Sequence, residues 1–263
     1  MKVVRTVSEL HALERAGSIG LVPTMGAYHE GHLSLFRAAQ AENDVVVASL
    51  FVNPAQFAAG DDFDRYPRDE ARDTKLAEEA GVDVLFVPVV AEIFPFGFET
   101  WVEVEKLGSR LEGRFRPGHF RGVATVCLKL FNLVRPDRAY FGQKDAQQAA
   151  VIKRMVRDLA VPVEIRVLPT VRDADGLALS SRNAYLSAAE RERALALPRA
   201  LEARDRSLLD GVEVDYFEEA EFEPRVLAAA VRVGRTRLID NVILEIPCQA
   251  SAWLGRTEKG ERP

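Results

Sequence analysis

The stretch that decides the fold is Ile19-Gly20-Leu21-Val22-Pro23-Thr24-Met25-Gly26-Ala27-Tyr28-His29-Glu30-Gly31-His32. Its first four residues form an apolar run typical of buried strands in parallel sheets, and Pro23, which has no N–H to donate to a ladder, is predicted to end the strand. Apolar side chains at positions 33, 35, 36 and 39 then follow a helical spacing. Residues 45–51 are so apolar and β-branched that they predict a central strand. This order of strand, loop, helix and strand indicates a parallel α/β unit.

The glycines and histidines of this loop predict phosphate binding. In a parallel α/β unit the loop lies at the carboxyl edge of the sheet, and the free N–H groups at the start of the helix point into the crevice where ligands bind. Gly26 and Gly31 allow the backbone to approach a phosphate, and His29 and His32 lie on one face of the first helical turn. We therefore expect a nucleoside triphosphate as the ligand.

Other polar residues follow predicted strands at the same edge. Asn53 and Gln56 supply amides after the second strand, and Lys144 is placed to pair with a phosphate, with Gln148 in the helical turn that follows. Alternatively, such amides satisfy the turns of their own loops. Two further stretches are equally open: residues 112–123, rich in arginine and glycine, and residues 180–182 (Ser-Ser-Arg) either bind an anion or form a solvated loop and a helix entry.

Composition indicates a soluble globular protein. The 263 residues are 48% hydrophobic and carry a net charge of −5 without a basic block, which argues against a nucleic-acid partner. The N-terminus has no apolar signal core and no run reaches about 18 apolar residues, so we expect no membrane association and a cytoplasmic location. Cys127 and Cys248 are far apart in the sequence and are expected to be reduced.

The remaining pattern predicts two domains. Apolar runs predict strands at residues 82–88, 100–104, 139–141, 163–167, 226–233 and 238–246. Helical spacing and end signals, with capping boxes at Thr6/Glu9 and Ser187/Glu190, predict helices near residues 7–17, 68–80, 124–134, 146–159 and 187–209. Residues 218–223 are expected to be an exposed acidic face. The order predicts a doubly wound, parallel-sheet, Rossmann-like domain over residues 1–172 and a smaller α+β C-terminal domain over residues 173–263.

The two histidines do not have the spacing of a zinc-protease helix, because only two residues separate them and one of these is a glycine. The sequence also lacks the G-x-x-x-x-G-K-[ST] loop and the G-x-G-x-x-G fingerprint, which disfavours P-loop kinases and nicotinamide dehydrogenases. Aspartates at positions 61, 62 and 64 are compatible with magnesium binding but fit a solvated loop better. No protein ligand to a metal is therefore assigned.

The H-x-G-H sequence at a helix start, with Ser-Ser-Arg about 150 residues later, resembles the H-I-G-H and K-M-S-K-S elements of the nucleotidyltransferase superfamily. More narrowly, the chain resembles the pantoate–β-alanine ligase family over roughly residues 1–190. The segments that carry the resemblance are residues 23–32, 51–57, 116–120, 141–145 with 147–148, and 179–183, with a weaker match at 235–241.

This resemblance implies a two-step reaction. Pantoate and ATP give pantoyl adenylate and pyrophosphate, and β-alanine then displaces AMP to form pantothenate. It also implies Mg2+ as a cofactor, a homodimer and a C-terminal domain that acts as a lid. Because the carboxylate of pantoate is itself the nucleophile, no activated serine or cysteine is required. The reaction instead requires stabilisation of charge on the α-phosphate and the departing pyrophosphate.

The resemblance also implies roles for individual residues. The implied catalytic residues are His32, as proton donor, with His29, Lys144, Ser180, Ser181 and Arg182. The implied ATP site comprises Met25, Gly26, Ala27, Tyr28, His29, Glu30, Gly31, His32, Gly142, Gln143, Lys144, Asp145, Val171, Leu179, Ser180, Ser181 and Arg182. Gln56 and Gln148 are implied to bind pantoate, with Gln56 also serving the β-alanine site.

The chain departs from the family pattern at three places. Ala146 stands where tyrosine is common, Leu179 stands where methionine is common, and residues 209–226 are shorter than the usual C-terminal segment. Two rival functions are a superfamily enzyme that transfers a nucleotidyl group to a phosphorylated acceptor and a non-catalytic ATP sensor. The first would need a cationic acceptor pocket where Gln56 and Gln148 offer neutral amides. The second would not need Lys144 and the Ser-Ser-Arg sequence.

Overall fold

The apolar runs of the first 168 residues form one six-stranded sheet in the computed structural model, which describes residues 1–14, 17–58 and 63–244. All neighbouring strands of this sheet are parallel. In sheet order the strands are β1 (Lys2–Val4), β4 (Val84–Phe86), β3 (Val45–Leu50), β2 (Ile19–Thr24), β5 (Arg138–Gly142) and β6 (Glu164–Leu168). The predicted parallel Rossmann-like sheet is therefore confirmed.

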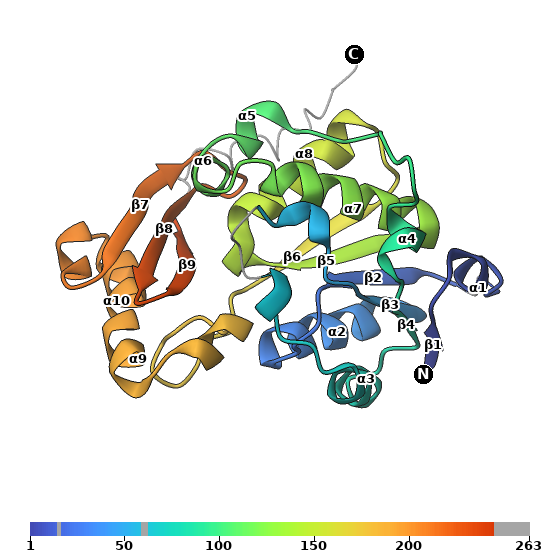
Figure 1. Ribbon diagram of the computed structural model, residues 1–263, viewed down its shortest axis with the longest axis horizontal. Helices are drawn as coiled ribbons and strands as arrows, with labels where there is room; N and C mark the ends of the chain where they lie inside the picture. Colours follow the sequence, from blue (N-terminus) through green and yellow to red (C-terminus); the bar gives the residue numbers. More distant parts are fainter. Residues whose placement is uncertain (15–16, 59–62, 245–263) are drawn as a thin grey trace, which may run out of the picture.

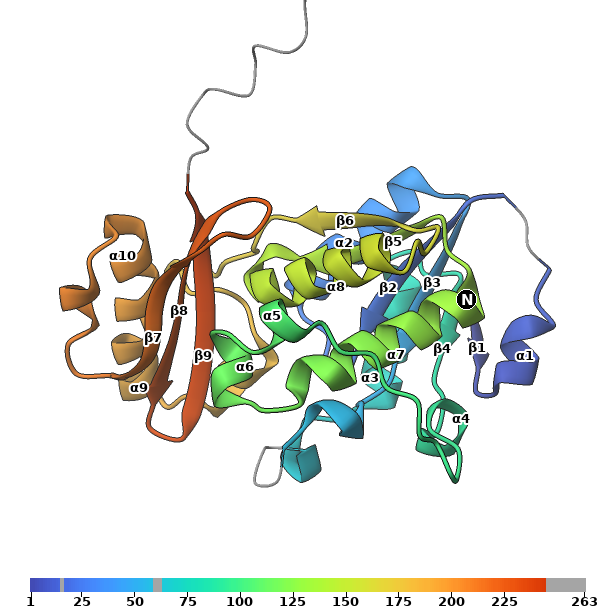
Figure 2. The same ribbon diagram turned by 90° about the horizontal axis from the view of Figure 1, so that it is seen from above.

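Helices cover both faces of this sheet (Figures 1 and 2). One face packs against α2 (Glu30–Glu42) and α3 (Glu70–Glu79), and the other packs against α7 (His119–Val134) and α8 (Ala146–Asp158). The shorter elements are α1 (Val7–His11), α4 (Val90–Ile93), α5 (Glu105–Gly108), α6 (Glu112–Phe115) and the 3-10 helices η1 (Pro54–Gln56), η2 (Phe63–Arg65) and η3 (Gln143–Asp145). Both predicted capping boxes are present, at the starts of α1 and of α9 (Ala188–Ala194).

The strand order reverses at β2, because β3 and β4 lie on one side of it and β5 and β6 on the other. At such a switch point the connections leave in opposite directions, and a crevice opens at the carboxyl edge of the strands. The segments that follow β2, β3 and β5 are the histidine loop, the Asn53–Gln56 turn and η3. The fold therefore gathers three of the predicted site segments at one edge.

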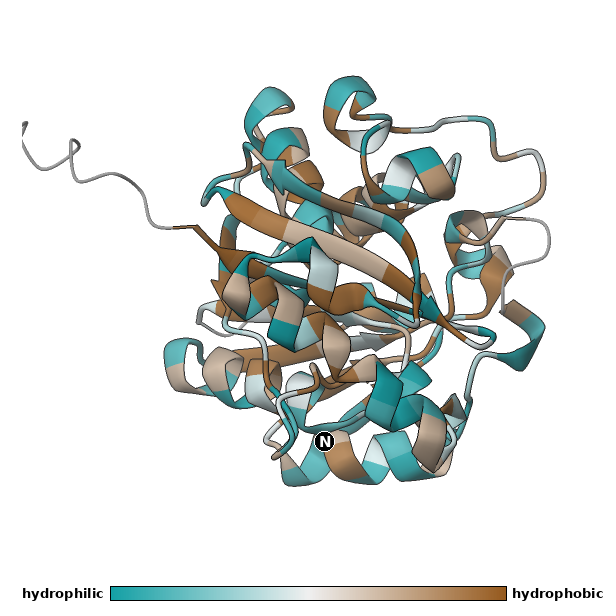
Figure 3. Ribbon diagram, turned by 90° about the vertical axis from the view of Figure 1, so that its left-hand side faces the viewer, coloured by the Kyte–Doolittle hydropathy of each residue, from teal (hydrophilic) through white to brown (hydrophobic). Residues whose placement is uncertain are grey.

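A second, antiparallel sheet lies beside this edge (Figure 1). It consists of β7 (Glu213–Ala220), β8 (Val226–Val233) and β9 (Thr236–Ile243) and is preceded by η4 (Ser181–Tyr185), α9 (Ala188–Ala194), α10 (Ala196–Ala203) and η5 (Arg206–Leu209). The central strand β8 is apolar along most of its length (Figure 3), because both of its faces are buried. One face packs with α10, and the other lies in a cluster with Leu111 and Ala146 of the first unit.

Strand β2 extends one residue beyond its predicted end. Pro23 lies within the strand opposite Ser49, and Thr24 closes it. The Thr24 hydroxyl donates to the Ser49 carbonyl oxygen over 2.6 Å, and the Thr24 N–H donates to Ser49 Oγ over 3.2 Å. These bonds hold Thr24 in the ladder although its neighbour has no N–H.

Helix α7 begins at His119 and not at Ala124 as predicted. Its N-cap is Gly118, with a φ of 81°, and Gly122 lies in its first turns, where glycine disfavours the helix in a sequence-based prediction. The glycine is required by packing, because a Cβ at position 122 would lie 2.2 Å from the Ala55 carbonyl oxygen. The close approach of the two backbones therefore requires a glycine, and this glycine makes the start of the helix unrecognisable from the sequence.

Four other element predictions need correction. Residues 100–104 alternate in burial but form no strand, and Val102 N–H instead donates to Thr125 Oγ1 over 3.0 Å. The predicted helix 187–209 divides at Leu195 into α9 and α10, because Pro198 supplies no N–H to continue the first helix. The short edge strand β1 and the strand β7, which includes part of the expected acidic face, were not predicted. Ile246, Cys248, Asp61 and Asp62 lie outside the described residues.

Candidate active site

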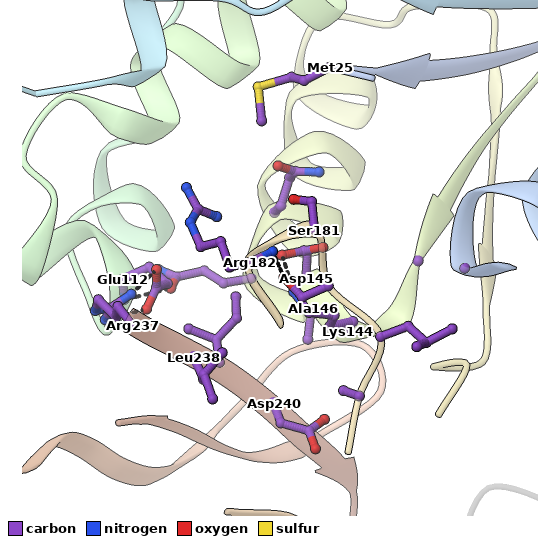
Figure 4. Close-up of a pocket in the computed structure, with 18 of the residues that line it drawn as sticks. Met25, Glu112, Lys144, Asp145, Ala146, Ser181, Arg182, Arg237, Leu238 and Asp240 are labelled. Atoms are coloured by element: carbon purple, nitrogen blue, oxygen red, sulfur yellow. Dashed lines mark hydrogen bonds and ion pairs between the residues drawn. The ribbon is translucent and has the colours of Figure 1, made fainter. Parts of the chain in front are cut away.

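A cavity of about 720 Å³ lies at the switch point, between the carboxyl edge of the large sheet and the small sheet. Figure 4 shows Met25 entering from the large sheet and Arg237, Leu238 and Asp240 from β9 on the opposite side, with Asp145, Ser181 and Arg182 between them. The lining thus combines cationic, hydroxyl and amide side chains from segments far apart in sequence.

The first wall of the cavity is formed by the two histidines at the start of α2. His29 is the N-cap of this helix, and its Nδ1 accepts from the Gly31 N–H over 3.2 Å. His32 Nδ1 faces the His29 N–H at 3.4 Å. A ring nitrogen that accepts a hydrogen bond carries no proton in the neutral imidazole, so Nε2 carries it in both rings. Both histidines line the cavity and can offer an Nε2–H donor to a ligand.

Burial keeps both imidazoles neutral near pH 7. Desolvation, with the nearby Lys144 charge, lowers the pKa of His29 to about 4. Desolvation, followed by the effects of His29 and Lys144, lowers the pKa of His32 to about 3. Negative charge placed in the cavity would raise both pKa values, because an anion stabilises the imidazolium form. The site is therefore suited to a ligand that brings its own negative charge.

The loop before these histidines is held by a buried carboxylate. Asp73 of α3 is 1% exposed and accepts from the Ala27 N–H over 2.7 Å and from the Tyr28 N–H over 2.8 Å. The Tyr28 ring packs edge-on against Phe36, and its hydroxyl lies 3.1 Å from Thr24 Oγ1. Gly26, with a φ of 87°, lies so close to Asp73 that a Cβ would be 2.8 Å from its Oδ2. This segment is thus fixed by tight packing within the first unit.

Gln56 is buried between the histidine wall and the start of α7. Its Nε2 lies 3.0 Å from Met25 Sδ, and its Oε1 accepts from Asn53 Nδ2 over 3.0 Å. Its carbonyl oxygen accepts from His119 Nδ1 over 2.8 Å and from Arg116 Nη2 over 3.3 Å. The carbonyl fixes the Nδ1–H tautomer of His119, so its Nε2 accepts from Arg116 at 3.2 Å. Desolvation, with the Arg116 charge, lowers the pKa of His119 to about 4.

The second wall comes from η3 and the first turn of α8. Lys144 has a side chain 20% exposed, and its Nζ lies 3.6 Å from Asp145 Oδ1. It is the only lysine among the described residues that line the cavity. Gln148, one turn into α8, also faces the cavity. The wall therefore offers an ammonium group and an amide close together.

The Ser-Ser-Arg segment completes this side. Ser180 is the N-cap of η4, and its Oγ accepts from the Arg182 N–H over 3.3 Å. Leu179 N–H donates to the Val171 carbonyl oxygen over 3.0 Å, which ties the segment back to the end of β6. Ser181 and Arg182 line the cavity together with Ser180 (Figure 4). The hydroxyls and guanidinium thus line the same cavity as the histidines and can donate to an anion there.

Most of the predicted site residues meet at this cavity. Those that line it are Met25, His29, Gly31, His32, Gln56, Gly142, Lys144, Asp145, Gln148, Val171, Leu179, Ser180, Ser181 and Arg182. The other five, which lie behind or beside the lining, are Gly26, Ala27, Tyr28, Glu30 and Gln143. Glu30 pairs with Arg37 on the surface, and Gln143 Nε2 donates to Asn241 Oδ1 over 2.9 Å.

Three kinds of residue at the site were not assigned from the sequence. Asp73 lies in a charged helix and had no sequence signal. Arg116 and His119 lie in the stretch whose anion-binding and solvated alternatives were both open, and they line the cavity. Glu112 and Arg237 form a buried pair across the two units, with Arg237 Nη2 2.6 Å from Glu112 Oε1 and the Tyr216 hydroxyl 2.8 Å from the same oxygen. Only the fold brings these two segments together.

The chemistry of the cavity favours charge stabilisation over covalent catalysis. Burial raises the pKa of the Cys127 thiol to about 12, so it is not a thiolate nucleophile. Within the described ranges no group of three or more histidine, cysteine, aspartate or glutamate side chains could hold a metal ion.

No helix in the described part of the chain is both long and apolar enough to cross a membrane.

Comparison with known proteins gives one consistent result. The family model for pantoate–β-alanine ligase matches residues 2–243. The pantothenate synthetase of Moorella thermoacetica is 51% identical over an alignment that covers 94% of this chain and 99% of the relative, and that of Sinorhizobium medicae is 57% identical, covering 86% and 78%.

Comparison with solved structures gives the same family. The pantothenate synthetase of Thermus thermophilus is similar with a TM-score of 0.88 and 48% identity, covering 92% of this chain and 99% of that one. The pantoate–β-alanine ligase of Francisella tularensis, solved in complex with β-γ ATP and β-alanine, has a TM-score of 0.85 and 36% identity, covering 92% and 97%. The chain therefore belongs to the pantoate–β-alanine ligase family.

Proposed function

We propose that this chain uses ATP to condense pantoate with β-alanine through a pantoyl-adenylate intermediate. The observation that carries the proposal is the meeting, in one cavity, of two Nε2–H donors, Lys144 and the Ser-Ser-Arg segment with the amides of Gln56 and Gln148. The cationic and hydroxyl groups suit a triphosphate, and the amides suit the hydroxyls and carboxylate of pantoate. Family membership supports the same assignment.

In the first step a pantoate carboxylate oxygen attacks the α-phosphorus of ATP. The bond from this phosphorus to the bridging oxygen breaks, and pyrophosphate leaves with the bonding electron pair. Negative charge grows on the α-phosphoryl oxygens and on the leaving group, so fixed donors directed at them lower the barrier. We assign this role to His29, His32, Lys144, Ser180, Ser181 and Arg182.

In the second step the amine of β-alanine attacks the acyl carbon of the adenylate. The carbon–oxygen bond to AMP breaks, AMP leaves, and the new amide loses a proton to solvent. We assign Gln56 to both the pantoate site and the β-alanine site, because it lies between the histidine wall and the start of α7. The Francisella tularensis relative was solved in complex with both β-γ ATP and β-alanine, which supports the binding of both kinds of ligand by this chain.

His32 can act as a proton donor once the charge of a ligand offsets its low pKa. Burial lowers that pKa to about 3, so the ring is neutral and donates from Nε2. A bound triphosphate raises the pKa, because its charge offsets the desolvation of the imidazolium. The ring can then carry a proton toward the phosphate oxygens when the charge there is greatest.

Magnesium is assigned to the nucleotide and not to a protein cage. The described residues offer no cluster of three metal ligands, and Mg2+ usually keeps water and phosphate ligands in such sites. Among the carboxylates that line the cavity, Asp145 lies next to Lys144, with its Oδ1 3.6 Å from the ammonium nitrogen. When bound, the ion would neutralise part of the phosphate charge, while the side chains named above orient the reacting groups.

The predicted domain division and assembly belong to the same proposal. We place the domain boundary near residue 172, with residues 173–263 acting as a lid, because the chain passes there from the large sheet toward the small one. We also propose a homodimer, which the family resemblance supports. Static light scattering at several concentrations tests this, and a monomer at every concentration would overturn it.

The decisive experiment is pantoate-dependent exchange of labelled pyrophosphate into ATP, with Mg2+ present and β-alanine absent. The adenylate pathway predicts exchange under these conditions. A folded protein that shows no exchange would overturn the proposal. Exchange with a phosphorylated acceptor in place of pantoate would favour the rival nucleotidyl transferase, and ATP binding without any exchange would favour the sensor.

A further inference from the structure

Asn241 of the small sheet holds the segment that carries Lys144. Its side chain is buried, at 4% exposure, and its Nδ2 donates to the carbonyl oxygens of Gln143 and Lys144 over 2.9 and 3.0 Å. Its Oδ1 accepts from Gln143 Nε2 over 2.9 Å. Both protons and the oxygen of the amide are therefore used by a two-residue stretch of the other unit.

The hydrogen bonds of Asn241 are more specific than packing of the two units against each other requires. Apolar side chains already join the units, through the cluster that contains Leu111, Ala146 and Ala228. A buried amide costs free energy unless all its hydrogen bonds are made. The Asn241 amide therefore fixes the position of the backbone that it bonds, in addition to joining the two units. The geometry that it sets is that of the η3 backbone, between the end of β5 and the start of α8.

The η3 backbone decides where the lysine charge lies. A lysine side chain is a point charge on a flexible four-carbon stem, so its time-averaged position depends strongly on where its backbone is anchored. Two bonds from one rigid amide fix this anchor. Removing them leaves two buried carbonyl oxygens without this donor and allows η3 to shift.

Asn241 is itself held in place by its neighbour. Its N–H donates to Asp240 Oδ1 over 2.8 Å, and Asp240, at 2% exposure, accepts two bonds from Arg172 over 2.6 and 3.1 Å. Arg172 also donates to the Gly176 carbonyl oxygen over 3.1 Å, in the loop that leads to Ser180. One end of β9 thus supports both phosphate-facing segments of the second wall.

We propose that Asn241 is a positioning residue for Lys144, so that the C-terminal sheet completes the active site by fixing η3 in addition to covering the cavity. This inference rests on the proposed function, since it takes Lys144 to act on the phosphates. It predicts that the contribution of Asn241 to turnover passes through Lys144.

The test is a double-mutant cycle on the pyrophosphate-exchange rate. Asn241→Asp keeps the shape of the side chain but places an oxygen against two carbonyl oxygens, and we expect kcat to fall by about 30-fold with little change in KM for ATP. In a Lys144→Ala background the same change should have little further effect, because the residue through which it acts is gone. Multiplicative losses would overturn the proposal.

Two further variants separate positioning from folding. Asn241→Ser retains one short donor and should recover part of the rate lost in Asn241→Asp. Arg157→Met removes another bond between the units, the 2.9 Å contact with Glu223 Oε2 on the outer surface, and should leave exchange unchanged. Equal losses of exchange rate in Arg157→Met and Asn241→Asp would show that any contact between the two units has the same effect, and would overturn the proposal.

A readout without turnover keeps this inference distinct from the proposed function. Lysine acylation followed by mass spectrometry reports the accessibility of Lys144, with the exposed Lys75 as an internal standard. In Asn241→Asp and Asn241→Ser we expect Lys144 to react several times faster, while Lys75 is unchanged. An unchanged Lys144 rate in both variants would overturn the inference. Absence of pantoate-dependent exchange in the unmodified protein would instead overturn the proposed function.

Discussion

The two walls of the cavity are supported in opposite ways. The histidine wall is held from within the first unit, by Asp73 on the loop N–H groups and by the packing of Tyr28 on Phe36. The lysine wall is held across the boundary between the units, by Asn241 on the η3 carbonyls and by Asp240 on Arg172. The contacts that hold one wall therefore lie within the large-sheet unit, whereas those that hold the other wall come from the small sheet.

This difference places the two sets of cavity-lining groups under different control. The donors at the start of α2 are held by contacts within the first unit, whereas Lys144 and the segment that leads to Ser180 are held through residues of the C-terminal sheet. In this view the C-terminal sheet acts on the chemistry through the backbone that it holds.

The largest effects are expected from removing the principal donor of either wall. His32→Ala and Lys144→Ala should each lower the exchange rate by about 100-fold or more, the usual cost of losing one preorganised transition-state donor. Steady-state exchange assays measure this, with circular dichroism to verify folding. Near-normal turnover in either variant would remove that residue from the mechanism.

A smaller effect is expected when the support of the histidine wall is weakened. Asp73→Asn replaces one acceptor oxygen by an NH2 group that faces a backbone N–H, and we expect exchange to fall by about 10-fold, because a hydrogen bond to a buried charged group contributes about 1.5–3 kcal/mol.

The same variant tests whether the walls are independent. Its effect should multiply with that of Asn241→Asp, because Asp73 and Asn241 act on opposite walls without shared partners. Asp69→Asn, at the N-cap of the same helix, is the matched control and should retain full exchange. A marked departure from multiplicative behaviour would mean that the two walls are coupled.

Acid should destabilise the folded chain through its buried histidines, of which His32 has the most strongly lowered pKa. The pKa of His32 is about 3 in the folded chain and near 6.5 when unfolded, so the unfolded state binds more protons between these values. The free energy of unfolding should therefore rise as pH increases from about 3 to 6.5 and level off above, with a slope of at most about 1.4 kcal/mol per pH unit for this group.

Urea unfolding followed by circular dichroism between pH 5 and pH 8 measures this slope. His32→Asn should reduce it, and His11→Asn, at an exposed position, should leave it as in the unmodified chain. An equal slope in His32→Asn and the unmodified chain would show that His32 does not carry the effect.

The smallest effect is expected at the outer surface of the histidine wall. Glu30, which the family resemblance assigns to ATP, pairs with Arg37 away from the cavity. Arg37→Ala breaks this exposed pair, and we expect the stability to change by less than about 0.5 kcal/mol and the exchange rate to stay constant. Thermal unfolding and exchange assays measure both. A large loss of exchange would place Glu30 at the nucleotide after all.

The sequence predicted the histidine wall better than the lysine wall. The apolar run before Pro23, the helical spacing after His32 and the β-branched residues 45–51 are local signals. The structure confirms the unit that they predict, apart from one residue at the end of each strand, because β2 extends to Thr24 and β3 ends at Leu50. Lys144 and Gln148 were correctly placed after a strand and in a helical turn. The hydrogen bonds by which Asn241 holds this segment could not be predicted, because Asn241 lies about a hundred residues further along the chain.

Residues were missed where a distant contact decided the outcome. Gly122 looked like a loop residue because glycine weakens a helix, although the nearby Ala55 backbone requires it. Asp73 looked like one more charge on a surface helix, yet it is 1% exposed and holds the loop before His29. Strand β7 was missed because its glutamates resemble a solvated face. In each case a tertiary contact that the local pattern does not show decides the role of the residue.

The sequence by itself determined the parallel sheet, the position of the loop with the two histidines, the family and fourteen of the residues that line the cavity. These follow from apolar periodicity, strand-end residues and short motifs, all of which are local. Tertiary structure alone decided that Asp73 supports the histidine loop, that Asn241 supports Lys144, and that Glu112 meets Arg237. Buried polar groups must find partners wherever the fold brings them, and which groups become neighbours depends on how the two sheets pack.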